Sequence, residues 1–104
     1  MKSKFHFTYI IECLDGTYYT GYTTDPLRRY EEHSSSYKGS KYMKQHPPKR
    51  IAYLTFFLTR SAATKLEAQI KSMSHSNKKS LILEHADHTA HILKSLIETP
   101  EEYC

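Results

Sequence analysis

The sequence predicts one domain of the α/β class, more narrowly α+β, in which a three-stranded antiparallel sheet is flanked by helices. Residues 5–13 alternate apolar and polar side chains with a period of two, and residues 17–23 are rich in Thr and Tyr, which is typical of strands. Apolar side chains in residues 63–73 instead recur at helical spacing. A chain of 104 residues has room for one core, and it lacks an apolar run near the ~20 residues that span a bilayer.

The hairpin formed by the two N-terminal strands turns at Gly16, and two registers are possible. A two-residue loop would set Tyr9 against Tyr22 and place Tyr19 on the opposite face of the sheet. A three-residue loop with Gly16 in the left-handed conformation would set Tyr9 against Gly21 and bring Tyr19 to the same face as Tyr9. We predict the three-residue loop, on the hypothesis that both tyrosines serve one site.

A helix is predicted from Pro26 to about Ser34. Asp25 is a suitable N-cap, because its carboxylate can accept hydrogen bonds from the free N–H groups of the first turn. Proline suits the first helical position, since it has no N–H group to leave unpaired there. Leu27 and Tyr30 are expected to face the core.

The second half of the chain completes a predicted β-β-α-β-α-α order with an added C-terminal helix. Residues 34–49 form a long loop, and residues 50–58 form a third strand that is apolar enough for a buried position. Three helices follow: one capped by Ser61, a short one capped by Ser76 and ending near His85, and a final amphipathic one that ends before Pro100.

Charge divides the chain into a basic body and an acidic end. Residues 1–80 hold 14 Lys and Arg against 6 Asp and Glu, whereas residues 81–104 hold one against five. A body with this excess of cations favours a polyanionic partner, although a solvated basic surface is the alternative. We therefore predict a module over residues 1–84 and an acidic helical extension over residues 85–104, which could fold over the body and limit nucleic-acid access.

Cysteine and histidine content indicates a compartment and raises one alternative metal site. Cys13 and Cys104 suggest reduced thiols and a cytoplasmic protein, and the N-terminus does not resemble a signal peptide. His85, His88 and His91 recur at i,i+3 spacing, which could suit Zn²⁺ or Ni²⁺. Successive steps of three drift around a helix, however, so a solvated helix is the favoured interpretation.

Several of these residues together match a known motif. Tyr9 lies in a strand, Tyr19-Thr20-Gly21 follows ten positions later, and Thr23-Thr24-Asp25 leads into a helix with Arg28-Arg29-Tyr30 and His33. This constellation resembles the GIY-YIG nuclease domain, and most closely its small single-domain members, over roughly residues 5 to 84. The resemblance implies a nuclease, although the first motif lacks the family glycine and has Thr8 before Tyr9.

The resemblance assigns the charged groups of a phosphodiester hydrolase. Glu67 matches the family glutamate on the helix after the third strand and would be the ligand of Mg²⁺ or Mn²⁺, which can bind through one carboxylate. The alternative is a plain i,i+4 ion pair with Lys71. Arg29, which precedes an aromatic residue as in the family, would clamp phosphate with its planar guanidinium.

The same resemblance assigns the proton-transfer groups. Tyr9 or Tyr19 would accept a proton from the attacking water, although a phenol ordinarily titrates near pH 10. His33 resembles the downstream histidine of the family and could shuttle protons, since an unperturbed imidazole titrates near pH 6.5. Packed strand aromatics and a surface histidine are the alternatives. Gly21 would permit close backbone approach to phosphate or simply mark a bulge.

Basic side chains near these residues are candidates for contact with a nucleic-acid backbone. Arg28 and Lys71 flank the predicted site, and Lys38 and Lys41 lie in a loop where Tyr and Lys alternate. A solvated loop is the alternative for that segment.

The favoured interpretation is a metal-dependent endonuclease of DNA, selective for DNA structure rather than sequence, in repair or recombination, with a protein partner as one source of specificity. Two alternatives stay open: a non-catalytic nucleic-acid-binding module on the same scaffold, and a partner-binding subunit without a nucleic-acid role. Dependence of cleavage on Mg²⁺ and Glu67 separates the endonuclease from the binding module. No membrane association is predicted.

Overall fold

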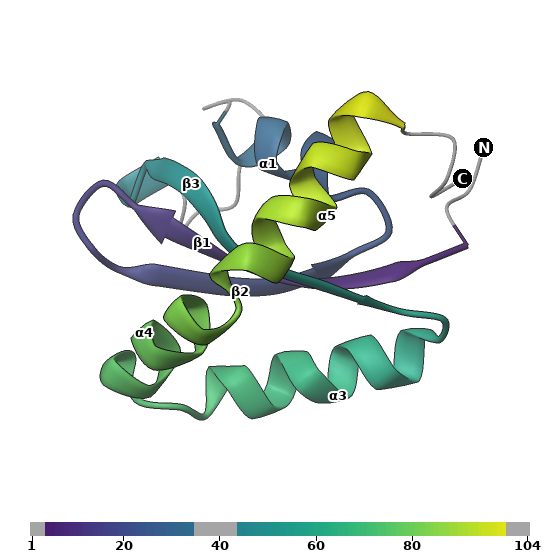
Figure 1. The fold of residues 1–104 in the computed structure, drawn as a ribbon. Helices are drawn as coiled ribbons and strands as arrows, with labels where there is room; N and C mark the ends of the chain where they lie inside the picture. Colours follow the sequence, from purple (N-terminus) through teal and green to yellow (C-terminus); the bar gives the residue numbers. More distant parts are fainter. Residues whose placement is uncertain (1–3, 35–43, 100–104) are drawn as a thin grey trace.

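A three-stranded antiparallel sheet with the strand order β2-β1-β3 forms the centre of the fold, and helices cover both of its faces (Figure 1). The structure, a computed structural model, describes residues 4–34 and 44–99. The elements are β1 (His6–Cys13), β2 (Tyr18–Thr23), α1 (Pro26–Ser34), β3 (Pro48–Phe57), α3 (Arg60–Lys71), α4 (His75–Glu84) and α5 (Ala86–Glu98). The predicted α+β class and element order are confirmed. Within these two stretches no helix combines the length and apolar character needed to cross a membrane.

The central strand β1 supplies both halves of the core. Its odd-numbered side chains, among them Phe7 and Ile11, pack with Ile92 and Leu96 of α5. Ile10 points to the other face and packs with residues of α3 and α4. Figure 1 shows the same division, with α1 and α5 on one side of the sheet and α3 and α4 on the other. Period-two alternation in β1 therefore sorts the helices between two layers.

The hairpin register is the one that the three-residue loop requires. Tyr9 pairs with Gly21, and Ile11 pairs with Tyr19, so both motif tyrosines lie on one face of the sheet. Gly16 has φ 86°, a left-handed conformation that glycine adopts without steric penalty. The prediction of this loop is confirmed.

The turn of this hairpin is held by two histidines from distant segments. His46 Nδ1 lies 2.6 Å from Asp15 Oδ2, and His75 Nε2 lies 2.9 Å from the carbonyl oxygen of Gly16. The His75 ring also stacks on Tyr18, with ring centroids 4.4 Å apart. Hydrogen bonds from Thr17, followed by the contact with His46, lower the pKa of Asp15 to about 2. The first residue of α4 is thereby fastened to the β1–β2 turn.

Two predicted helix caps are wrong by two positions. Thr59 caps α3 by accepting a hydrogen bond from Ala62 N at 3.2 Å, and Ser74 caps α4 by accepting one from Asn77 N at 3.2 Å. The expected caps Ser61 and Ser76 lie inside these helices. Thr59 and Ser74 themselves have extended backbone, which is the geometry of an N-cap, whereas Ser61 and Ser76 already lie within the helices.

The predicted α1 is confirmed, but one of its core contacts is not. Asp25 accepts a hydrogen bond from Arg28 N at 3.3 Å, as expected for its N-cap. Leu27 is exposed, whereas Pro26 and His33 are the buried residues of the helix. Tyr30 packs against the core as predicted. The helix is therefore rotated so that a histidine, rather than a leucine, faces the sheet.

The third strand lies at an edge of the sheet rather than at its centre, although its middle is buried. Ala52, Tyr53 and Leu54 are almost fully covered. Burial at an edge is possible here because α5 packs against β3, and the buried Thr89 Oγ1 accepts a hydrogen bond from Leu54 N at 3.1 Å. An edge strand normally leaves such N–H groups open to pairing with another chain. The C-terminal helix thus protects part of this edge.

We expect Thr89→Val to lower the free energy of unfolding by about 1–3 kcal/mol, because the buried N–H group of Leu54 loses its acceptor. Urea unfolding followed by circular dichroism measures this loss. Thr89→Ser is the matched control, since it keeps the hydroxyl acceptor and removes only the methyl group. Equal losses in the two variants would show that the methyl packing, and not the hydrogen bond, holds α5 to the edge.

Candidate active site

Tyr9 lies at the centre of the predicted site, and its position depends on Gly21. The two residues are paired across β1 and β2, and Tyr9 is 3% exposed. A Cβ atom added to Gly21 would collide with the Tyr9 hydroxyl and Cζ and would lie 3.0 Å from Cε2. The phenol ring therefore occupies the space that any other residue at position 21 would fill. Close approach of a side chain, rather than a bulge, explains this glycine.

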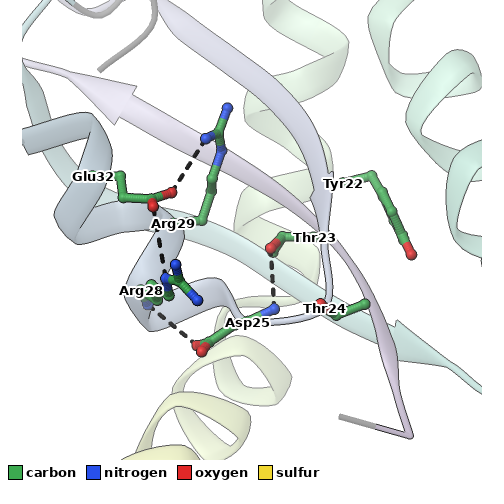
Figure 2. Close-up of a pocket in the computed structure, with 7 residues that line it drawn as sticks. All are labelled: Tyr22, Thr23, Thr24, Asp25, Arg28, Arg29 and Glu32. Carbon is green, nitrogen blue, oxygen red and sulfur yellow. Dashed lines mark hydrogen bonds and ion pairs between the residues drawn. The ribbon is translucent and has the colours of Figure 1, made fainter. Parts of the chain in front are cut away.

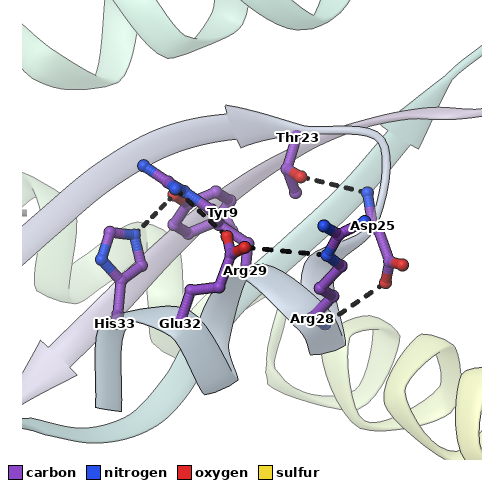
Figure 3. Close-up of polar contacts among 7 residues, drawn as sticks. All are labelled: Tyr9, Thr23, Asp25, Arg28, Arg29, Glu32 and His33. Atoms are coloured by element: carbon purple, nitrogen blue, oxygen red, sulfur yellow. Dashed lines mark hydrogen bonds and ion pairs between the residues drawn. The ribbon is translucent and has the colours of Figure 1, made fainter. Parts of the chain in front are cut away.

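The Tyr9 hydroxyl joins two predicted site residues of α1 (Figure 3). Tyr9 Oη lies 3.2 Å from His33 Nε2, and Arg29 also forms a hydrogen bond with this hydroxyl. Because Arg29 can only donate, the phenol proton is available to His33 Nε2, which then carries its own proton on Nδ1. His33 is 3% exposed, and its Nδ1 finds no hydrogen-bond partner among residues 4–34 and 44–99.

Burial dominates the electrostatics of this pair. Burial raises the pKa of Tyr9 to about 12, the nearby Tyr19 contributes to the rise, and the Arg29 hydrogen bond opposes it. Burial also lowers the pKa of His33, and the positive charge of Arg29 lowers it further. Both shifts favour the uncharged form. Near neutral pH the site therefore holds a protonated phenol that faces a neutral imidazole able to accept its proton.

Tyr19 forms a side wall beside these two residues. Its ring centroid lies 6.4 Å from that of Tyr9 and 5.0 Å from that of His33, the latter in an edge-to-face arrangement. Tyr19 is only partly buried. The structure thus brings four predicted site residues together: Tyr9, Tyr19, Arg29 and His33.

An open polar pocket of about 410 Å³ adjoins Arg29, between the end of β2 and the start of α1 (Figure 2). Within it the Glu32 carboxylate contacts Arg29 Nη1 at 3.3 Å and Arg28 Nε at 3.7 Å. The pocket is lined by Tyr22, Thr23, Thr24, Asp25, Arg28, Arg29 and Glu32.

Sequence reasoning missed two residues of this pocket, Glu32 and Tyr22. Glu32 was detectable, because it follows Arg29 by three positions and Arg28 by four on the same helix. Tyr22 contacts His6 through its hydroxyl at 2.6 Å, and the Arg60 guanidinium lies 5.7 Å from the centroid of its ring. The contact with Arg60 depends on tertiary structure, which no local pattern in the sequence reveals.

Glu67 lies on α3, on the other side of the sheet, but its charge reaches the site. The negative charge of Glu67 contributes, as the smallest of five influences, to the raised pKa of Tyr9. Its carboxylate is 20% exposed and pairs with Lys71 Nζ at 3.0 Å, as the alternative interpretation anticipated. A single partly exposed carboxylate is compatible with Mg²⁺, which keeps several waters and takes few protein ligands. No group of three or more potential metal ligands forms in the described part of the chain, the C-terminal histidines included.

Of the four basic residues predicted to contact nucleic acid, the structure describes two, Arg28 and Lys71. Arg28 is 74% exposed at the mouth of the pocket, and Lys71 is engaged with Glu67. Lys38 and Lys41 lie outside the described residues.

Comparisons with known proteins identify relatives of this arrangement. A family model described as the GIY-YIG catalytic domain matches residues 5–80. A UPF0213 protein of Listeria welshimeri is 43% identical over 83 residues, which cover 80% of this chain and 91% of the relative. A UPF0213 protein of Haloquadratum walsbyi is 42% identical over 85 residues, covering 82% and 94%. The solution NMR structure of an E. faecalis protein is similar with a TM-score of 0.57 and 38% identity, covering 83% of this chain and 92% of that protein.

We expect Gly21→Ala to destabilise the fold by about 1–3 kcal/mol, because the new methyl group must displace the buried phenol of Tyr9. Gly16→Ala is the matched control: nothing lies within 4 Å of its added Cβ, so only the left-handed backbone costs about 1 kcal/mol. Urea unfolding measures both losses, and the ring NMR signals of His33 report displacement of Tyr9. If the His33 signals of Gly21→Ala matched those of wild type, the proposed close contact would be wrong.

Proposed function

The chain belongs to the GIY-YIG family, and on this basis we propose that it is a metal-dependent endonuclease that hydrolyses phosphodiester bonds in DNA. The observation that carries the proposal is the hydrogen-bonded series Arg29, Tyr9 and His33, which combines a phosphate-binding cation with a proton-transfer pair. A small domain offers few base contacts, so we propose that it selects DNA structure rather than sequence, on branched or damaged substrates of repair or recombination.

The proton acceptor in this proposal is the Tyr9–His33 pair rather than Tyr9 alone. With a pKa of about 12, Tyr9 is almost entirely protonated near pH 7 and a free phenolate is too rare to serve as base. His33, whose pKa is lowered by burial, is neutral and accepts at Nε2. The phenol oxygen can then take a proton from the attacking water while its own proton passes to His33.

Arg29 and Glu67 supply the remaining charges. Arg29 donates to the phenol oxygen and borders the pocket, where its guanidinium can contact a non-bridging phosphate oxygen and stabilise the charge that develops in the transition state. Glu67 would hold the divalent cation, which supplies Lewis-acid stabilisation of phosphate oxygens. Binding of a cation requires Glu67 to give up or share its present partner Lys71.

One observation favours the second candidate, nucleic-acid binding without cleavage. The Glu67 carboxylate is already neutralised by Lys71, which is the arrangement of a structural ion pair on a helix surface. The two candidates differ in whether Glu67 and a divalent cation change the rate of bond cleavage.

We expect nicked, flapped or branched DNA to be cleaved in the presence of Mg²⁺ or Mn²⁺. Loss of the general base in Tyr9→Phe should slow cleavage about 10²–10⁴-fold, and loss of the phosphate cation in Arg29→Ala about 10²–10³-fold. Glu67→Gln should abolish the response to the metal. Single-turnover rates on a panel of these substrates and plain duplex make the measurement.

The controls remove the same groups elsewhere: Tyr53→Phe takes a hydroxyl from a buried tyrosine on the opposite face, and Glu12→Gln takes a carboxylate from β1. Cleavage that survives the changes at Tyr9, Arg29 and Glu67 would reject the nuclease proposal. Salt-dependent DNA binding without any cleavage would support the binding module instead.

The cleavage rate is expected to fall on the acid side of pH 6.5. The pKa of His33 is lowered in the folded protein, so essentially all of the imidazole is in its neutral, proton-accepting form above the ordinary pKa of about 6.5. This form is lost as the pH falls through the folded-state pKa. Below that value the rate should drop about tenfold per pH unit. Rates between pH 5 and 8 for wild type and His33→Gln test this, with circular dichroism at each pH because protonation of His33 also weakens the fold. If the fall in rate at low pH persisted in His33→Gln, protonation of another group would be its cause.

A further inference from the structure

Glu32 bridges the two arginines of the pocket in a way that a phosphate group could reproduce. One carboxylate oxygen faces Arg29 Nη1 at 3.3 Å and the other faces Arg28 Nε at 3.7 Å (Figures 2 and 3). The two guanidinium groups are therefore brought within the reach of a single small anion. Guanidinium binds carboxylate and phosphate through the same planar pattern of N–H donors.

The contacts of Glu32 are accessible ones. Its side chain is 25% exposed, and it borders a pocket that opens to solvent. Ion pairs that border solvent, as these partly buried ones do, contribute modestly to stability, because water and salt screen them. A polyanion that approaches the pocket can therefore replace Glu32 without disrupting the core.

Arg29 does not depend on Glu32 for its position beside Tyr9. Its guanidinium also makes the hydrogen bond with the Tyr9 hydroxyl, which is held in turn by His33. Removing the carboxylate should leave Arg29 in place with unused donors. These contacts therefore favour Glu32 as a competitor for Arg29 rather than as a support that positions it.

We propose that Glu32 occupies the place of a backbone phosphate in the free protein and must be displaced from Arg28 and Arg29 when a nucleic-acid strand binds. The inference rests on the nucleic-acid-binding part of the proposed function and not on catalysis. Glu32 then sets a threshold: a single weak anion competes poorly with an internal carboxylate, whereas a strand anchored at several phosphates displaces it.

The test compares Glu32→Gln with Glu31→Gln. Glu31 is exposed on the same helix and makes no ion pair within the described part of the chain, so both variants raise the net charge equally. The probe is a fluorescein-labelled flapped DNA duplex in EDTA, without divalent cations, titrated at several NaCl concentrations and followed by anisotropy. We expect Glu32→Gln to bind about two- to fivefold more tightly than Glu31→Gln, because one carboxylate that competes for both arginines through weak ion pairs is lost.

Salt dependence provides the second readout. The slope of log K against log salt should be steeper for Glu32→Gln than for Glu31→Gln, because salt screens the Glu32 contacts that a strand must displace, so the advantage of Glu32→Gln shrinks as salt rises. Glu32→Ala should behave like Glu32→Gln, which guards against an effect of the new amide group.

Three results would overturn the inference. Equal affinity of Glu32→Gln and Glu31→Gln would show that only net charge matters, and weaker binding by Glu32→Gln would make Glu32 a support for the arginines. In both cases cleavage that still depends on Tyr9 and Arg29 would leave the proposed nuclease standing. Absence of DNA binding by wild type and every variant would remove both proposals together.

Discussion

The packing of Tyr9 against Gly21 is the constraint on which the rest of the site depends. The phenol ring fills the space of a missing side chain, so the hydroxyl arrives at a fixed point beside α1. That pairing exists only in the register set by the three-residue turn, in which Gly16 is left-handed. A slip of one residue would turn every side chain of β2 to the other face and set a side chain against Tyr9. A loop at one end of the hairpin therefore determines the chemistry available near the other.

The helix that carries the arginines is positioned largely by polar contacts of the site itself. Pro26 and His33 are its buried residues, and its apolar contribution to the core is the partly buried Tyr30. Buried polar groups are tolerated when they are hydrogen-bonded, and the Tyr9 hydroxyl meets this condition. His33 Nδ1 does not meet it among the described residues, which costs stability. Retaining an imidazole there makes sense if the group is needed for proton transfer.

The sequence was sufficient wherever local rules decide the structure. Turn geometry left two hairpin registers open, and the hypothesis that Tyr9 and Tyr19 serve one site selected the observed one. Asp25 and Pro26 fix the start of α1, and the motif spacing correctly placed His33 beside Tyr9. The sequence was insufficient where several local structures were equally compatible with it. Hydroxyl residues stand at 59, 61, 74 and 76, and which of them caps a helix depends on which one has extended backbone in the folded chain. Leu27 was misplaced because the rotation of α1 is set by contact of His33 with the sheet, a tertiary effect.

Charge in this protein acts at two levels. The excess of cations over residues 1–80 produces a long-range field that attracts polyanions, whatever their sequence. At short range several of these cations are already paired, since Glu32 holds Arg28 and Arg29 and Glu67 holds Lys71. Net charge consequently overstates the number of cations free to bind phosphate. Because exposed pairs are weak, their exchange for phosphate costs little for each pair, but every exchange requires a new anion at a defined place. For the proposed nucleic-acid partner, this arrangement predicts general attraction but firm binding only of a strand whose phosphates reach these particular partners.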